Sequence, residues 1–152
     1  MRSGKRQSVA GCALVSLLIG TTAAMAAGKA TLKEGEHVIH VGETAEFPIQ
    51  SSSDASTEFS AWCEVSTGGR ASITFDGDHY IPMSDPAVGD VISFAPNETR
   101  RYDLAGSVEA NRGDAYIAFA FTGVPQAVCF PGQQCEGAAA GAVEVKVKCA
   151  NN

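Results

Sequence analysis

Asp114-Ala-Tyr-Ile-Ala-Phe-Ala-Phe-Thr122 is the stretch of sequence that decides the fold. All six residues from Tyr116 to Phe121 are apolar, so a strand formed here would be apolar on both of its faces. Such a strand is typical of the middle of a sheet that is covered on both sides. We therefore place residues 114–122 at the centre of the molecule and expect the other strands to be arranged around them.

Most other runs alternate between apolar and polar residues, as expected of strands that are covered on one face. The clearest of these runs are residues 44–50, 58–65, 71–76, 91–94, 101–108 and 143–149. No stretch after residue 26 has the apolar period of 3.6 residues that indicates a helix. About eight short strands with frequent turns predict an all-β fold, an antiparallel two-sheet sandwich.

Two local signals concern how these strands pair. Pro48 cannot donate a backbone hydrogen bond, so the run 44–50 is predicted to be an edge strand. Gly68 and Gly69 separate two runs that are each apolar on one face, and this arrangement predicts that residues 58–65 and 71–76 form a hairpin.

Two segments resemble immunoglobulin-like domains. Val41-Gly-Glu-Thr-Ala-Glu-Phe-Pro-Ile49 is similar to their opening strands, and Asp114-Ala115-Tyr116 resembles the turn into their late central strand. The sequence departs from the family in that Trp62 directly precedes a cysteine and the central run contains no cysteine. The resemblance implies an immunoglobulin-like outline of the sandwich and implies no activity.

Residues 1–26 have the composition of a signal peptide. Three cations in the first six residues precede an apolar run from Ala10 to Gly20, and Ala24-Met25-Ala26 offers the small residues that a signal peptidase requires. Cleavage after Ala26 would place the protein in the periplasm or outside the cell. Residues 27–36 are polar and predict a flexible arm, which leaves residues 37–152 as a single β-sandwich domain.

The exported portion is strongly acidic. The whole chain has 11 Lys and Arg against 17 Asp and Glu, and residues 1–26 carry three of the cations and no acid, so their removal changes the net charge from −6 to −9. A chain of this charge is repelled by phosphate backbones and by anionic lipid surfaces. We therefore expect a protein partner, no nucleic acid, and no membrane contact after the signal peptide has been removed.

Four cysteines follow the signal peptide: Cys63, Cys129, Cys135 and Cys149. An even number in an exported chain indicates two disulfides formed in an oxidising compartment. Cys63 and Cys149 both lie on the apolar faces of their runs and could meet inside the sandwich, while Cys129 and Cys135 could close a short loop. The two other pairings stay open. By the chain-entropy argument, the long closure stabilises the fold by about 4.6 kcal/mol and the short one by about 2.4 kcal/mol.

The loop between Cys129 and Cys135 is the first candidate for partner binding. Pro131-Gly132 at its centre favours a type II turn, which would present Phe130 at a rigid tip. A clamped loop loses little entropy on docking, so it suits a protein partner or the cleft of an extracytoplasmic enzyme that it inhibits. The alternative is a stapled loop whose Phe130 packs against the edge of the core.

Trp62 is the second candidate for partner binding. It shares one face of its run with Ser60 and Glu64. If that face meets solvent, Trp62 marks a contact patch. If a second sheet or a loop covers the face, Trp62 belongs to the core. The sequence leaves both alternatives open.

A group of four aspartates is a weak candidate for a calcium site: Asp76, Asp78, Asp85 and Asp90. Calcium requires six or more oxygen ligands, and the twelve-residue spacing of an EF-hand loop is absent. A solvated acidic loop explains the aspartates equally well. The cysteine spacing also lacks the C-x-x-C pair of common zinc sites, and we expect no metal and no other cofactor.

No catalytic pattern stands out in the sequence. A Gly-x-Ser-x-Gly nucleophile elbow is absent, and only three histidines could serve as a base. We therefore expect a secreted or periplasmic protein that is not an enzyme and that binds a protein partner. Two alternatives are an inhibitor of an extracytoplasmic enzyme, acting through the Cys129–Cys135 loop, and a subunit of a surface fibre that polymerises by strand addition.

Overall fold

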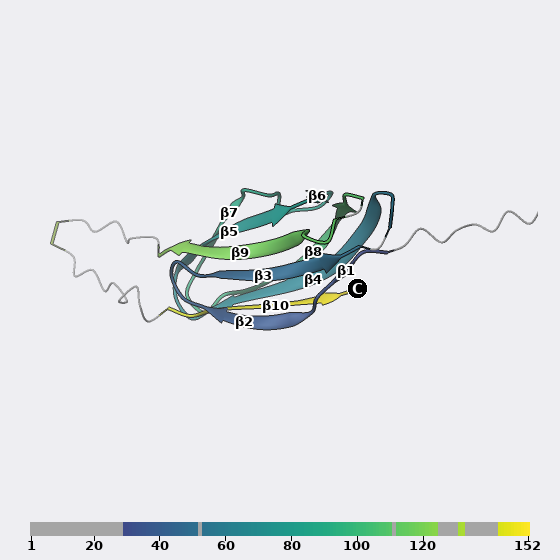
Figure 1. Cartoon of the computed structure of the whole chain (residues 1–152). Coiled ribbons are helices and arrows are strands. Elements are labelled where there is room, and N and C mark those ends of the chain that lie inside the picture. The colour runs from purple at the N-terminus through teal and green to yellow at the C-terminus, as the bar shows by residue number, and fades with distance from the viewer. Residues whose placement is uncertain (1–28, 52, 111, 125–130, 133–142) are drawn as a thin grey trace, which may run out of the picture.

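The structure, a computed structural model of the chain, describes residues 29–51, 53–110, 112–124, 131–132 and 143–152. These residues form ten β-strands and no α-helix, and the strands make two sheets packed face to face (Figure 1). All strand pairs within the sheets are antiparallel. The predicted all-β, antiparallel two-sheet sandwich is confirmed. No described segment is a helix long and apolar enough to cross a membrane.

Each sheet has five strands. In spatial order the first sheet contains β1 (Thr31–Leu32), β3 (Thr44–Gln50), β9 (Tyr116–Gly123), β5 (Ala71–Asp78) and β7 (Val91–Phe94). The second sheet contains β2 (Gly35–Ile39), β10 (Val145–Asn151), β4 (Thr57–Thr67), β8 (Thr99–Val108) and β6 (Tyr80–Pro82). Consecutive strands therefore close both sides of the sandwich, β1 and β2 on one side and β6 and β7 on the other.

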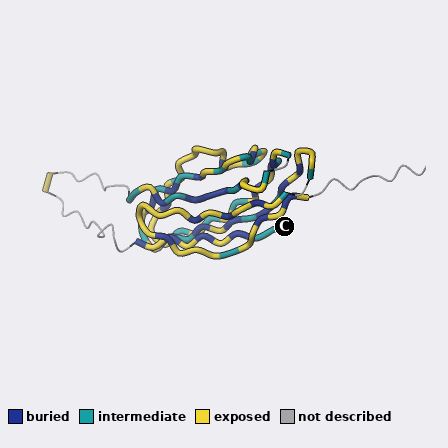
Figure 2. The backbone as a smooth tube through the Cα atoms, in the orientation of Figure 1, coloured by how far each residue is buried: buried dark blue, intermediate teal, exposed yellow. Residues whose placement is uncertain are grey.

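The core lies between the sheets and consists of the side chains that alternation predicts. Buried and exposed residues alternate along most of the strands, as Figure 2 shows for the longer ones. The largest fully buried side chains are Phe47, Phe59, Phe75, Phe119, Phe121, Ile49, Ile73, Leu104, Ile117, Val65, Val108 and Val145. At about 0.8 kcal/mol per buried methylene, these side chains are the main source of the free energy of folding.

Strand β9 occupies the centre of the first sheet, as the run 114–122 predicts. Its inward residues Ile117, Phe119 and Phe121 are buried. The expectation that both faces are covered is corrected, because Tyr116 and Ala120 on the outward face are only half-buried. The outward residue Ala118 is nevertheless buried, since it is small and lies between the neighbouring strands β3 and β5.

The predicted hairpin of residues 58–65 and 71–76 does not form. Strands β4 and β5 belong to different sheets, and the chain crosses the sandwich at Gly68-Gly69. The apolar faces of the two strands therefore meet across the core instead of lying side by side. Gly69 permits this crossing, because a Cβ atom there would lie 2.8 Å from Cγ2 of Val143.

The flexible arm expected over residues 27–36 is wrong from Ala30 onward. Leu32 in β1 is buried, and its backbone N–H donates to Oδ1 of Asn151 over 2.7 Å. The N–H of Lys33 donates to the carbonyl of Pro48 over 2.8 Å, so β1 lies outside β3 in the sheet. Pro48 therefore sits next to a two-residue edge strand, and its missing N–H faces that side.

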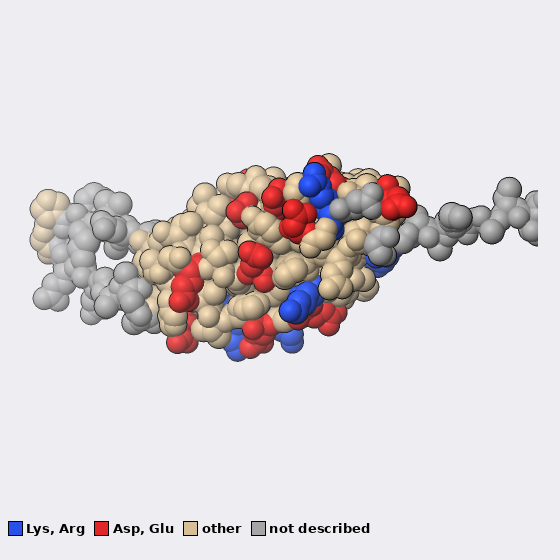
Figure 3. Space-filling model, viewed as in Figure 1, with Lys and Arg blue, Asp and Glu red and all other residues tan. Residues whose placement is uncertain are grey.

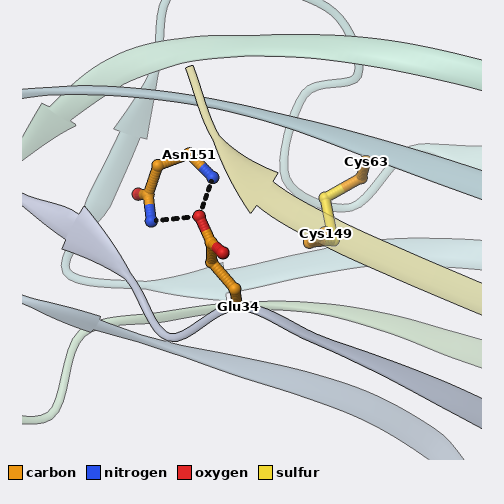
Figure 4. Close-up of a disulfide and its surroundings, with 4 residues drawn as sticks. All are labelled: Glu34, Cys63, Cys149 and Asn151. Atoms are coloured by element: carbon orange, nitrogen blue, oxygen red, sulfur yellow. Dashed lines mark hydrogen bonds between the residues drawn. A yellow bond between two sulfur atoms is a disulfide. The ribbon is translucent and has the colours of Figure 1, made fainter.

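A disulfide joins Cys63 of β4 to Cys149 of β10, as predicted (Figure 4). The two cysteines lie directly opposite each other on neighbouring strands of one sheet, and both are buried. The bond therefore staples two strands within a sheet, unlike the bond between sheets in antibody domains. Beside it, Asn151 donates from its backbone N–H and its side-chain amide to Oε1 of Glu34 (Figure 4).

Candidate binding surface

Only two residues of the predicted binding loop are described. Gly132 has a φ of 98°, in the left-handed region that the third position of a type II turn requires. Pro131 and Gly132 are both exposed and form a turn. Cys129, Phe130 and Cys135 lie outside the described residues. The second disulfide and a contact through Phe130 therefore stay predictions.

Trp62 lies on the outward face of β4, and its neighbours Ala61 and Cys63 point into the core. The ring is half-buried under two cationic side chains from adjacent strands. The centroid of the ring lies 4.4 Å from Cζ of Arg101 and 5.9 Å from Nζ of Lys148. The sequence left open whether Trp62 lies on the surface or in the core. Trp62 lies on the outer surface, where two cations cover its ring, and it does not belong to the core.

The four aspartates of the weak calcium candidate make separate local contacts. Oδ1 of Asp76 accepts from the N–H of Gly77, Oδ1 of Asp78 from His79, and Oδ2 of Asp90 from Ala87. The side chain of Asp85 is exposed and makes no hydrogen bond to another described residue. Across the described ranges, no group of three or more His, Cys, Asp or Glu residues is arranged to hold a metal ion. The calcium hypothesis therefore finds no support in this part of the chain.

His79 is the centre of a polar cluster at one end of the sandwich. Its Nδ1 lies 3.0 Å from Oε2 of Glu109, and its Nε2 lies 3.5 Å from Oδ2 of Asp114. The backbone of His79 adopts the left-handed region with a φ of 53°. These contacts connect the β5–β6 turn to the segment between β8 and β9, and they therefore stabilise that end of the sandwich.

The outward face of the first sheet is acidic. Glu46 of β3 and Asp76 of β5 flank Ala118 of β9 in one cross-strand row, and Asp78 lies beside Tyr116 in the next. Figure 3 shows acidic side chains spread over the visible face with few cations between them. Burial is the first cause that raises the pKa of Tyr116 above its ordinary value, and the charges of Asp76, Asp78 and Glu46 add to it.

One side of the sandwich differs from this charged surface. The segment from Tyr80 to Phe94 runs first along β8 as strand β6 and then along β5 as strand β7 (Figure 1). It carries four large apolar side chains that are exposed to solvent, and we call them the apolar side: Ile81 at 54%, Met83 at 77%, Val88 at 39% and Val91 at 65%. Asp85 and Asp90 are the only charged residues in this segment.

The edges of the two strands on this side are not equivalent. The backbone groups of successive residues in a strand point alternately to its two sides. Since the N–H of Met83 donates to the carbonyl of Ala105 in β8, the backbone groups of Tyr80 and Pro82 point away from β8. Pro82 lacks an N–H and blocks further pairing at β6. Because the N–H of Phe75 donates to Asp90, the backbone groups of Val91 and Ser93 point away from β5. Among the residues that the structure describes, no strand pairs with this outer edge of β7, and the edge contains no proline.

The free part of the β7 edge has defined ends. On one side, the N–H of Ala95 donates to Oε2 of Glu98 over 2.7 Å, and the Ala95 carbonyl accepts from the hydroxyl of Thr67. On the other side, the N–H of Asp90 donates to the carbonyl of Ala87. A shallow, open depression borders the same segment and is lined by Pro82, Met83, Ser84, Asp85 and Ala87.

Comparisons with family models, with curated proteins and with solved structures found no match for this chain. The sequence alone did not point to the apolar side, because residues 76–90 resemble a solvated acidic loop. A usable signal was present in the segment Ile81 to Val91. Four large apolar residues occur there without the two-residue or 3.6-residue period that would bury them, so they had to be exposed or to cover one another.

Proposed function

We propose that this protein is an extracytoplasmic, non-catalytic β-sandwich that binds a protein partner through the apolar side. One observation carries the proposal: four of the six large apolar side chains that are exposed among the described residues belong to the single segment 81–91. Exposed apolar side chains that gather in one stretch of the chain, here β6, β7 and their connection, favour a protein–protein contact site. The remaining two, Val38 and Val41, lie at the other side of the sandwich.

The chemistry of the described residues supports binding without catalysis. No serine or threonine hydroxyl in this part of the chain hydrogen-bonds to a histidine, and both ring nitrogens of His79 face carboxylates. A nucleophile activated by a neighbouring base is therefore missing from what the structure describes. The Cys63–Cys149 disulfide fits an oxidising compartment, which agrees with the signal peptide predicted over residues 1–26 and with a periplasmic or extracellular protein.

A subunit of a surface fibre is the second candidate, and the free edge of β7 favours it. An exposed edge without proline or charge can accept a strand from another chain. The third candidate, an inhibitor that acts through the Cys129–Cys135 loop, depends on residues outside the described ranges. It stays a hypothesis that alanine at Phe130 and Pro131 would test.

Affinity capture from the native envelope and secreted fractions tests the proposal. The baits are the mature wild-type chain, the variant Met83→Glu/Val91→Glu, and the matched control Val38→Glu/Val41→Glu, which adds the same charge at the opposite side. We expect the wild type and the control to recover the same protein and the Met83/Val91 variant to lose it. Equal recovery by all three baits would show that the apolar side is not the contact surface.

A further inference from the structure

The edge of β7 can pair with a second copy of itself, because an antiparallel pairing about a two-fold axis matches N–H donors with carbonyl acceptors. Two residues, Val91 and Ser93, present four outward backbone groups, two N–H donors and two carbonyl acceptors. Resting on the proposed function, we infer that the apolar side binds a second copy of this chain, with β7 paired antiparallel to the β7 of that copy across a two-fold axis at Ile92.

The pairing would satisfy all four outward groups in each copy. In the two-fold register centred on Ile92, the N–H of Val91 donates to the carbonyl of the partner's Ser93, and the N–H of that Ser93 donates back to the carbonyl of Val91. The symmetry-related pair repeats both bonds, which gives four hydrogen bonds across the axis. The two copies of the first sheet would then form one continuous ten-stranded sheet.

The side chains at this edge suit the same arrangement. Val91 is 65% exposed on the outward face, and Ile92 is half-buried on the face that turns toward the core. The pairing places Ile92 opposite the partner's Ile92 and Val91 opposite the partner's Ser93. Both apolar side chains would lose solvent contact, and such cross-strand pairs stabilise a sheet.

Charge favours this edge over the rest of the surface as the place where two copies meet. Each exported chain carries a net charge of −9, so two copies repel each other over distances of about one Debye length. Residues 91–95 contain no charged side chain, whereas the outward face of the first sheet presents Glu46 and Asp76. Two copies joined at β7 therefore keep their acidic faces side by side and not in contact.

Proline and symmetry together limit the assembly to two copies. Pro82 prevents the neighbouring edge of β6 from pairing, so the second sheet contributes only apolar contacts. A two-fold pairing uses the same edge of both copies and leaves no β7 edge free to continue. The expected product is a closed dimer, which distinguishes the inference from an open fibre.

Sedimentation velocity of the mature chain over a wide concentration range tests the inference. We expect a monomer at low concentration, a dimer at high concentration, and a stronger dimer in high salt because salt screens the net charge. Ser93→Pro removes one outward N–H from each copy without touching the bonds to β5, and it should weaken the dimer by about tenfold or more. Ser93→Ala is the matched control and should dimerise like the wild type.

Val91→Glu provides a second route, in case proline disturbs β7. A glutamate on each edge adds negative charge near the axis between two copies that are already acidic, and it should abolish the dimer, whereas Val38→Glu on the opposite side should affect it far less. Amide hydrogen exchange adds a direct readout. Exchange at Val91 and Ser93 should slow as the concentration rises, while Ile92 and Phe94, which face β5, should not change.

Three results would overturn the inference. The first is a monomer at every concentration with unchanged exchange at Val91 and Ser93, and the second is a dimer that Val91→Glu leaves intact. The third is a ladder of species beyond two copies, which would favour the fibre. If the chain stays monomeric while the capture experiment still depends on Met83 and Val91, the self-pairing is wrong and the proposed function stands.

Discussion

The ring of Tyr80 lies over the backbone of Gly106, so a residue with a side chain at that position of β8 would displace the ring and the backbone of Ile81. A Cβ atom on Gly106 would overlap the Tyr80 ring and lie 2.5 Å from the carbonyl oxygen of Ile81. The tyrosine hydroxyl donates to the carbonyl of Ala105 over 3.1 Å. Its ring meets that of Phe59 edge to face, with centroids 5.4 Å apart. This contact fixes β6, and with it the start of the apolar side.

Gly106→Ala should destabilise the protein by about 1–3 kcal/mol, because the added methyl group forces the Tyr80 ring and β6 away from β8. The free energy of unfolding in urea measures the effect. Gly113→Ala is the control, since a Cβ atom there would meet nothing within 4 Å. If both variants unfold at the same urea concentration, the close approach of Tyr80 to Gly106 does not constrain the fold.

Alkaline pH should destabilise the protein through Tyr80. Burial raises the pKa of the Tyr80 hydroxyl to about 12, above the value of 10.0 expected for the unfolded chain. The folded state therefore holds this proton more tightly, so the contribution is fully present below pH 10 and is lost as the pH rises toward about 12. The free energy of unfolding, measured between pH 8 and the alkaline limit of the buffer, should fall less steeply in Tyr80→Phe. Parallel curves for the two proteins would refute the prediction.

Removing the disulfide with Cys63→Ala/Cys149→Ala should lower the free energy of unfolding by about 2–5 kcal/mol, since the bond closes a long loop in the unfolded chain. Thermal unfolding with and without a reducing agent checks the prediction, because reduction should affect the wild type more than the variant. The matched variant Cys129→Ala/Cys135→Ala tests the bridge predicted from the sequence, which should contribute only about 2.4 kcal/mol. If Cys129→Ala/Cys135→Ala were less stable than Cys63→Ala/Cys149→Ala, the short bridge would contribute more to stability than the long one.

Trp62 is the only tryptophan in the sequence, so its fluorescence reports on one site. Arg101→Ala removes the guanidinium that covers the ring and should increase quenching by acrylamide, with a loss of stability of no more than about 1 kcal/mol. Arg112→Ala, which removes a cation that contacts Glu109 and is not among the cations over the Trp62 ring, is the control. Unchanged quenching in Arg101→Ala would mean that the ring is shielded by something other than the cation.

The alternation of apolar residues predicted the two-sheet sandwich, the central place of β9 and the Cys63–Cys149 bond, because the period of a strand determines which side chains face the core. The period does not determine which strands become neighbours. The runs on either side of Gly68-Gly69 have the pattern of a hairpin, yet they pack across the core, because each run pairs with strands from other parts of the chain.

The sequence did not predict the apolar side, for a related reason. Val91 to Phe94 has the pattern of a short strand, but nothing in those four residues states that β7 lies at the edge of its sheet. Whether a backbone group is free depends on the neighbouring strands, which come from distant parts of the chain. The orientation of Trp62 was also undecided in the sequence, and the packing of Ala61 and Cys63 decided it.

The position of β10 between β2 and β4 has a consequence for the export that the signal peptide predicted over residues 1–26 implies. A polypeptide that crosses a membrane from its amino end exposes β2 and β4 long before residues 145–151 arrive. Until then the edges of β2 and β4 that pair with β10 have no partner, and Cys63 is a free thiol because Cys149 has not yet arrived. Under the predicted export, folding would therefore finish with the insertion of one late strand, and a chain that stalled during transport would expose two strand edges with which a foreign strand could pair.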